Sequence, residues 1–127
     1  KESTQTKILF HTFISNPMTT NSVVYWTQDQ TKVLYNSMNT VGIYDMVSDT
    51  HTVIPVQHRI IDVAETDTLI FLLGKNGHDY SVDVIEKTNT LVGHFDFTAE
   101  SAFIKTYDNA LFLGRDSNIS KIQVSRK

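Results

Sequence analysis

The 127-residue chain contains no cysteine, so disulfide bonds, thiolate metal sites and cysteine nucleophiles are excluded. It has no strong excess of one charge, because 11 basic and 14 acidic residues are scattered along it and leave a formal net charge of −3. That balance does not favour binding to nucleic acid or to an anionic membrane. No apolar run approaches the roughly 18 residues of a membrane span, and the polar first residues lack a signal-peptide core. We therefore expect either a cytoplasmic or nuclear protein, or a mature or excised segment of a longer one.

Motifs that carry catalysis are missing as well. The chain has no G-x-S-x-G nucleophile elbow, no P-loop and no G-x-G-x-x-G phosphate-binding loop. Its five histidines show neither the i, i+4 spacing of a helical metal site nor the H-x-H spacing of a strand site. The sequence therefore predicts no enzyme, no metal site and no cofactor.

What the chain does contain is a series of short apolar runs, rich in Val, Ile, Leu, Phe and Tyr and separated by Asn, Asp, Thr, Gly and Ser. This alternation is typical of strands and turns. No stretch sustains the i, i+3, i+4, i+7 stripe of a helix. The pattern predicts an all-β fold with strands at Ile8–Ile14, Val23–Thr27, Lys32–Ser37, Val41–Val47, Thr52–Val56, Ile60–Ala64, Thr68–Leu73, Tyr80–Glu86, Thr90–Phe95, Ala102–Thr106, Ala110–Leu113 and Ile119–Val124.

These strands fall into three repeats, with approximate boundaries at residues 22–57, 58–97 and 98–127. Val53 and Leu91, in the fourth strands of the first two repeats, stand 38 residues apart. The third repeat lacks a fourth strand. A lone four-stranded meander leaves apolar faces exposed, whereas stacked against like neighbours it buries them. The spacing therefore predicts one domain over residues 1–127, made of stacked antiparallel sheets.

The third strands of the repeats share a further feature. Ile43-Tyr44-Asp45-Met46 and Val82-Asp83-Val84 are each followed by a polar turn and a short fourth strand, and Asp116 lies between the second and third strands of the last repeat. Over residues 22–124 the chain thus resembles WD40-type β-propeller repeats, although no Trp-Asp pair ends a third strand and no Gly-His pair precedes a first strand. The resemblance implies a partial propeller of about three blades. The recurring Asp45 and Asp83 indicate a turn hydrogen bond.

Three blades are too few to close a ring, because propellers use about four to eight. By the resemblance, the N-terminal strand Ile8–Ile14 would pair with the last blade on closure. The sequence leaves three arrangements open: a ring completed by another protein, a six-bladed dimer, and an open packing of three sheets. Unpaired edges and exposed faces are a liability for a monomer. We therefore expect a protein partner that completes or caps the propeller, or a homo-oligomer, and no nucleic-acid or membrane partner.

The resemblance also implies where partners bind: at the loops that join fourth to first strands and second to third strands. Arginine and aromatic side chains at such a rim are typical anchors. Phe97 is assigned to a connecting segment, Asp96–Ser101. The predicted binding residues are Arg59, Lys75, His78, Phe97 and Arg115.

The favoured hypothesis is a non-enzymatic interaction scaffold, a propeller segment within a multi-subunit assembly. The alternative is a ligand-binding or lectin-like oligomeric propeller, for which no repeated aromatic-plus-arginine pair is found. A propeller hydrolase is less favoured, because nothing in the sequence requires one.

Overall fold

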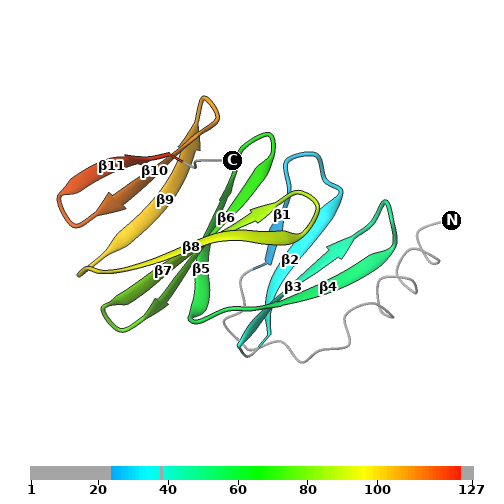
Figure 1. Ribbon diagram of the computed structural model, residues 1–127, viewed down its shortest axis with the longest axis horizontal. Coiled ribbons are helices and arrows are strands. Elements are labelled where there is room, and N and C mark those ends of the chain that lie inside the picture. The colour runs from blue at the N-terminus through cyan, green and yellow to red at the C-terminus, as the bar shows by residue number, and fades with distance from the viewer. Residues whose placement is uncertain (1–23, 38, 124–127) are drawn as a thin grey trace, which may run out of the picture.

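The computed structural model describes residues 24–37 and 39–123, and in this part of the chain every regular element is a β-strand (Figure 1). The strands form three antiparallel sheets, in each of which consecutive strands are hydrogen-bonded neighbours. The predicted strand Ile8–Ile14 lies outside the described residues. The described part holds no helix that is long and apolar enough to cross a membrane.

The sheets follow one another along the chain. The first sheet consists of β1 (Val24–Trp26), β2 (Lys32–Ser37), β3 (Thr40–Asp45) and β4 (Thr50–Pro55). The second sheet consists of β5 (Arg59–Glu65), β6 (Leu69–Asn76), β7 (Asp79–Glu86) and β8 (Thr90–Thr98). The third sheet consists of β9 (Ala102–Tyr107), β10 (Ala110–Arg115) and β11 (Asn118–Ile122). The predicted all-β fold of antiparallel repeats is confirmed, and every predicted strand from Val23 onward has a counterpart.

Polar residues make the turns by adopting left-handed backbone conformations. Asp108 and Asn109, with φ of 54° and 59°, form the two-residue turn between β9 and β10. Two positive φ values define a type I′ turn, whose twist matches that of the flanking strands. Asn89, at φ 70°, ends the three-residue loop between β7 and β8. Asparagine and aspartate tolerate this region better than most side chains do.

Of the two recurring aspartates, only Asp45 makes the predicted turn hydrogen bond. Its Oδ1 accepts N–H bonds from Val47 and Ser48 at 3.0 and 3.2 Å. The prediction for Asp83 is wrong, because Asp83 lies in the middle of β7. The position that corresponds to Asp45 in the second sheet is Glu86, at the end of β7. Sequence spacing alone aligns Asp83 with Asp45 wrongly, because β7 has eight residues whereas β3 has six.

Phe97 lies within β8, so its assignment to a connecting segment is wrong. β8 continues to Thr98 and pairs with β7 over this length. Phe95 and Phe97 alternate with polar residues, so that the aromatic rings face one side of the sheet and the polar side chains face the other. The polar residues Asp96 and Thr98 are typical of a loop, but here they form the polar side of an amphipathic strand.

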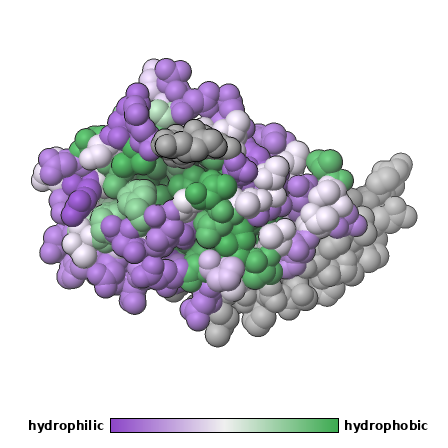
Figure 2. Space-filling view, in the orientation of Figure 1, coloured by the Kyte–Doolittle hydropathy of each residue, from purple (hydrophilic) through white to green (hydrophobic). Residues whose placement is uncertain are grey.

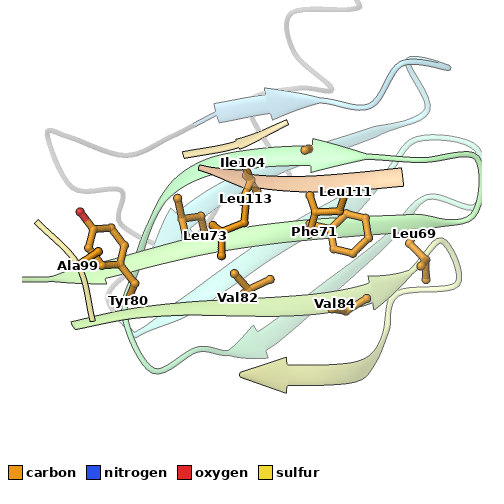
Figure 3. Packing of buried hydrophobic residues seen from close by; sticks show 11 residues of the cluster. Leu69, Phe71, Leu73, Tyr80, Val82, Val84, Ala99, Ile104, Leu111 and Leu113 are labelled. Carbon is orange, nitrogen blue, oxygen red and sulfur yellow. The ribbon is translucent and has the colours of Figure 1, made fainter. Parts of the chain in front are cut away.

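Two apolar clusters join the three sheets. One, between the first and second sheets, centres on Leu34, Ile43 and Ile70. The other lies between the second and third sheets, where Figure 3 shows Phe71 and Leu73 beside residues of the third sheet. Residues 69–74 of β6 are buried on both sides, which explains the unbroken apolar run there. The second sheet is therefore the middle layer of the stack (Figure 1).

Buried polar groups add directional contacts between the first and second sheets. The buried carboxylate of Glu65 accepts hydrogen bonds from the Tyr25 hydroxyl at 2.6 Å, the Gln28 N–H at 2.8 Å and the Lys87 ammonium at 2.8 Å. Burial, together with this carboxylate, raises the pKa of Tyr25. Because a buried charge is costly unless it is paired, these three donors make Glu65 a stable link between the two sheets.

Candidate protein-interaction surfaces

One end of the stack carries the turns between β6 and β7 and between β10 and β11, together with the connections that enter β5 and β9. We call it the loop end. Backbone register places four side chains in one line there: Arg59 opposite Lys75, Lys75 opposite Tyr80, and Tyr80 opposite Phe97. Residues that are directly opposite in a sheet point to the same face, here the face toward the third sheet. Arg115 of the third sheet extends the line. We call these five residues the cation–aromatic row.

Two stacked rings in this row lie between the cations Lys75 and Arg115. The Lys75 ammonium lies 5.8 Å from the centroid of the Tyr80 ring. The rings of Tyr80 and Phe97 are stacked, with centroids 5.2 Å apart. The Arg115 guanidinium lies 5.4 Å from the Phe97 centroid, and its Nε donates to the carbonyl oxygen of Thr98 at 3.0 Å. The hydrogen bond and the ring together fix the direction of the Arg115 guanidinium.

His78 lies at the rim of the loop end and not in the row. It occupies the turn between β6 and β7, and its exposed ring is 3.4 Å from the Glu100 carboxylate. Its carbonyl oxygen accepts the N–H of Ala99 at 3.1 Å, which ties this turn to the connection between the second and third sheets. The structure therefore brings together four of the five predicted binding residues and places the fifth beside them.

A pocket of about 550 Å³ opens beside the row. It is lined by Gln57, His58, Asp79, Tyr80, Asp96, Phe97, Thr98 and Arg115. Among the described residues, no group of three or more His, Cys, Asp or Glu side chains is placed to hold a metal ion.

Tyr80, which joins the two halves of the row, was not among the predicted binding residues. It is a buried strand residue, and its sequence pattern indicates only core packing. Its place between Lys75 and Phe97 follows from the pairing of three strands. The available sequence signal for this position is the two-residue turn at Gly77-His78, because it fixes the register between β6 and β7.

A second surface is the face of the third sheet that points away from the second sheet. Ile104, Leu111 and Leu113 face the second sheet, so the residues between them point outward. Three outward apolar side chains are highly exposed: Phe103 at 50%, Tyr107 at 76% and Ile119 at 70%. We call this surface the open face; it consists of Phe103, Lys105, Tyr107, Phe112, Ile119 and Lys121.

Apolar surface also continues alongside β11. A groove of about 610 Å³ between the second and third sheets is lined in part by Leu69, Phe71, Leu111 and Ile122. Figure 2 shows hydrophobic side chains gathered where these two sheets meet, with hydrophilic residues around them. Phe95 of β8, the fourth strand of the second sheet, packs against the apolar cluster between the second and third sheets. The described part of the third sheet ends at β11.

The family comparison agrees with this arrangement of stacked four-stranded sheets. A family model described as beta-propeller protein matches residues 1–127. The chain belongs to the β-propeller family. No curated protein matches it significantly. In this propeller chain the three sheets correspond to blades, and the loop end and the open face are surfaces of those blades.

Proposed function

We propose that this propeller chain is a non-enzymatic interaction segment that binds other proteins within a multi-subunit assembly. The observation that carries the proposal is the open face of the third sheet. The opposite face of that sheet is buried against the second sheet, with Ile104, Leu111 and Leu113 in the shared cluster. The open face has a similar apolar character but leaves Phe103, Tyr107 and Ile119 at least half exposed. Exposed apolar surface of this kind marks an interaction site.

The open face also indicates what its partner should contribute. Covering a large apolar side chain is worth about 1.5–3 kcal/mol relative to leaving it exposed. Lys105 and Lys121 lie on the same face, the latter directly opposite Phe112. A partner surface with an apolar centre and carboxylates near these two lysines would match both features. A further propeller-like sheet, from another protein or a second copy, has the required shape.

The loop end provides a second contact surface for the assembly. Arginine and aromatic residues dominate the binding energy of many interfaces, and the cation–aromatic row combines them. Tyr80 is buried and Phe97 is already stacked between neighbours in the chain, so these rings are used in internal packing. The row offers a partner the exposed side chains of Lys75 and Arg115. At the loop end this favours protein recognition over the lectin-like alternative, because a sugar site there would need an exposed ring.

The test is the mass of the protein in solution, measured by analytical ultracentrifugation over a range of concentrations. We expect species heavier than the 14.4 kDa monomer, in reversible equilibrium with it. Replacing Tyr107 and Ile119 by lysine should shift the equilibrium to monomer, because it removes apolar surface from the open face. Both side chains are so exposed that their removal leaves the core intact. Val47→Lys, in an exposed turn of the first sheet, is the matched control and should associate like the wild type. A wild-type protein that stays soluble and monomeric at every concentration would contradict the proposal, because it would show that the open face is stable in water without a partner.

A further inference from the structure

β8 has one apolar side and one polar side, and the polar side carries contacts that core packing does not explain. Phe95 and Phe97 face the third sheet, whereas His94 and Asp96 face the opposite way. His94 lies directly opposite Asp83 of β7, and Asp96 lies directly opposite Ser81. The side chains of Asp83, His94 and Asp96 form one hydrogen-bonded group on this face, which we call the acid–histidine trio.

Both ring nitrogens of His94 meet carboxylate oxygens. Nδ1 is 2.6 Å from Oδ1 of Asp83, and Nε2 is 2.9 Å from Oδ1 of Asp96. An ionised carboxylate only accepts hydrogen bonds, so both contacts are satisfied only when both nitrogens carry a proton. A neutral imidazole would direct a lone pair at one of the two oxygens. The geometry therefore fits the imidazolium form.

The two carboxylates differ in how much they depend on His94. The Asp83 side chain is 5% exposed, and its Oδ2 is buried with no hydrogen-bond partner among the described residues. The Asp96 side chain is 55% exposed and is stabilised by water as well. A buried carboxylate is costly unless it is paired. Loss of one proton from His94 would therefore remove the positive charge beside Asp83 and leave this buried carboxylate with at most a neutral hydrogen bond.

The trio is connected to the loop end through Asp96 and β8. Asp96 lines the pocket beside the row, together with Phe97 and Arg115. In the described part of the chain β8 pairs only with β7, so its hold on the sheet depends on that one ladder and on the His94–Asp83 contact. Weakening this contact would loosen the strand that carries Phe97, and would leave the Asp96 carboxylate without its paired cation at the edge of the pocket.

We propose that the acid–histidine trio is a proton-dependent latch that fixes β8 and thereby makes the loop-end surface responsive to pH. Its consequence for partner binding rests on the proposed function, whereas the latch itself is a property of the isolated chain. With His94 protonated, β8 is held against β7, and Phe97 is held against Tyr80 and Arg115. With His94 neutral, β8 opens more often and the pocket becomes more negative.

The direction of the pH effect follows from the surroundings of His94. The hydrogen bond to Asp83, together with the charges of Asp83 and Asp96, raises the pKa of His94 above its ordinary value, although partial burial opposes this. A raised pKa in the folded state means that the stabilisation is fully present below the unfolded value of about 6.5 and is lost as pH rises through the folded value. Asp79 and His58, whose Nδ1 is 3.1 Å from the Ser81 hydroxyl, are the next titratable groups on this face.

The test is amide hydrogen exchange of the free protein, measured residue by residue by NMR between about pH 6 and pH 9 and corrected for intrinsic exchange. We expect protection of the Phe95 and Phe97 amides to fall by roughly tenfold for each unit by which the folded pKa exceeds the unfolded one. Protection in β2 and β3 should change much less. A uniform response of all strands, or none in β8, would overturn the latch.

Three variants make the assignment specific. His94→Gln should remove the pH dependence of β8 protection, because glutamine does not titrate. His78→Gln is the matched control, since this exposed histidine faces Glu100 and should leave that dependence unchanged. Should His94→Gln fail to fold, Asp96→Asn removes the exposed carboxylate and should move the midpoint to lower pH. The latch is wrong if His94→Gln retains the wild-type response or if Asp96→Asn leaves the midpoint in place. Because no partner is present, failure here leaves the proposed interaction function untouched.

Discussion

Two aromatic side chains in the propeller chain lie flat across glycines of the neighbouring strand. Tyr35 of β2 covers Gly42 of β3, and Phe103 of β9 covers Gly114 of β10. A Cβ atom at either glycine would overlap the ring opposite. The glycines are therefore required for space, and the aromatic rings take the place of the missing side chains in packing.

The residue-scale prediction concerns Gly42. Gly42→Ala should lower the free energy of unfolding by about 1–3 kcal/mol, because the added methyl group displaces the buried Tyr35 ring. Gly93→Ala is the control, since its Cβ would meet Val84 at 3.4 Å, an ordinary contact. Urea unfolding of the two variants decides the matter. Equal losses would show that backbone freedom, and not the ring, determines the need for glycine.

At the scale of elements, hydrogen bonds from side chains to backbone groups connect one sheet to the next. The buried Asn36 of β2 donates through Nδ2 to the Ile60 carbonyl oxygen at 2.7 Å and accepts the Ile60 N–H at 3.1 Å. Asp62, beyond the irregularity in β5, accepts the N–H of Ile104 in β9 at 3.3 Å. These bonds satisfy backbone groups that the ladders leave free, and they fix each sheet against its neighbour.

Asn36→Ala should therefore cost about 2–4 kcal/mol of stability, because it leaves both backbone groups of Ile60 buried without this partner. Asn109 is the matched control. It makes a similar reciprocal pair with Asp67 at 2.9 Å, but on the exposed loop between β9 and β10. Asn109→Gly, which suits the positive φ of this position, should cost less than about 1 kcal/mol, because water replaces the lost bonds. Thermal unfolding compares the two, and similar losses would contradict the role given to burial.

The strands themselves were predictable from sequence, because their signals are local. The sequence predicts Lys32–Ser37 with its observed bounds, and the apolar run Thr68–Leu73 predicts β6. The errors arose where register was needed. Sequence spacing aligns Asp83 with Asp45, although β6 and β7 are each two residues longer than β2 and β3. It also puts Phe97 in the connecting segment Asp96–Ser101, although β8 continues to Thr98. The cation–aromatic row depends on strand register, because the pairing of three strands puts Tyr80 between Lys75 and Phe97.

For the whole molecule, the decisive asymmetry is between the second sheet and the third. The second sheet contributes to both apolar clusters, one on each face. The third sheet contributes to one cluster and carries Phe103, Tyr107 and Ile119 on its open face. A propeller blade is stable when neighbours cover both faces. The stability of the third sheet should therefore depend on whatever covers the open face.

This dependence predicts that heat stability rises with protein concentration if a second copy covers the open face. Association that requires the folded state adds about 2.7 kcal/mol at a hundredfold excess over Kd. For a domain of this size that corresponds to a rise in Tm on the order of 5–15 °C. Scanning calorimetry at low and high concentration measures it. The variant with Tyr107 and Ile119 replaced by lysine should unfold at one temperature throughout, whereas Val47→Lys should follow the wild type. If that open-face variant kept the wild-type concentration dependence, self-association would involve another surface, and the occupant of the open face would have to be a different protein.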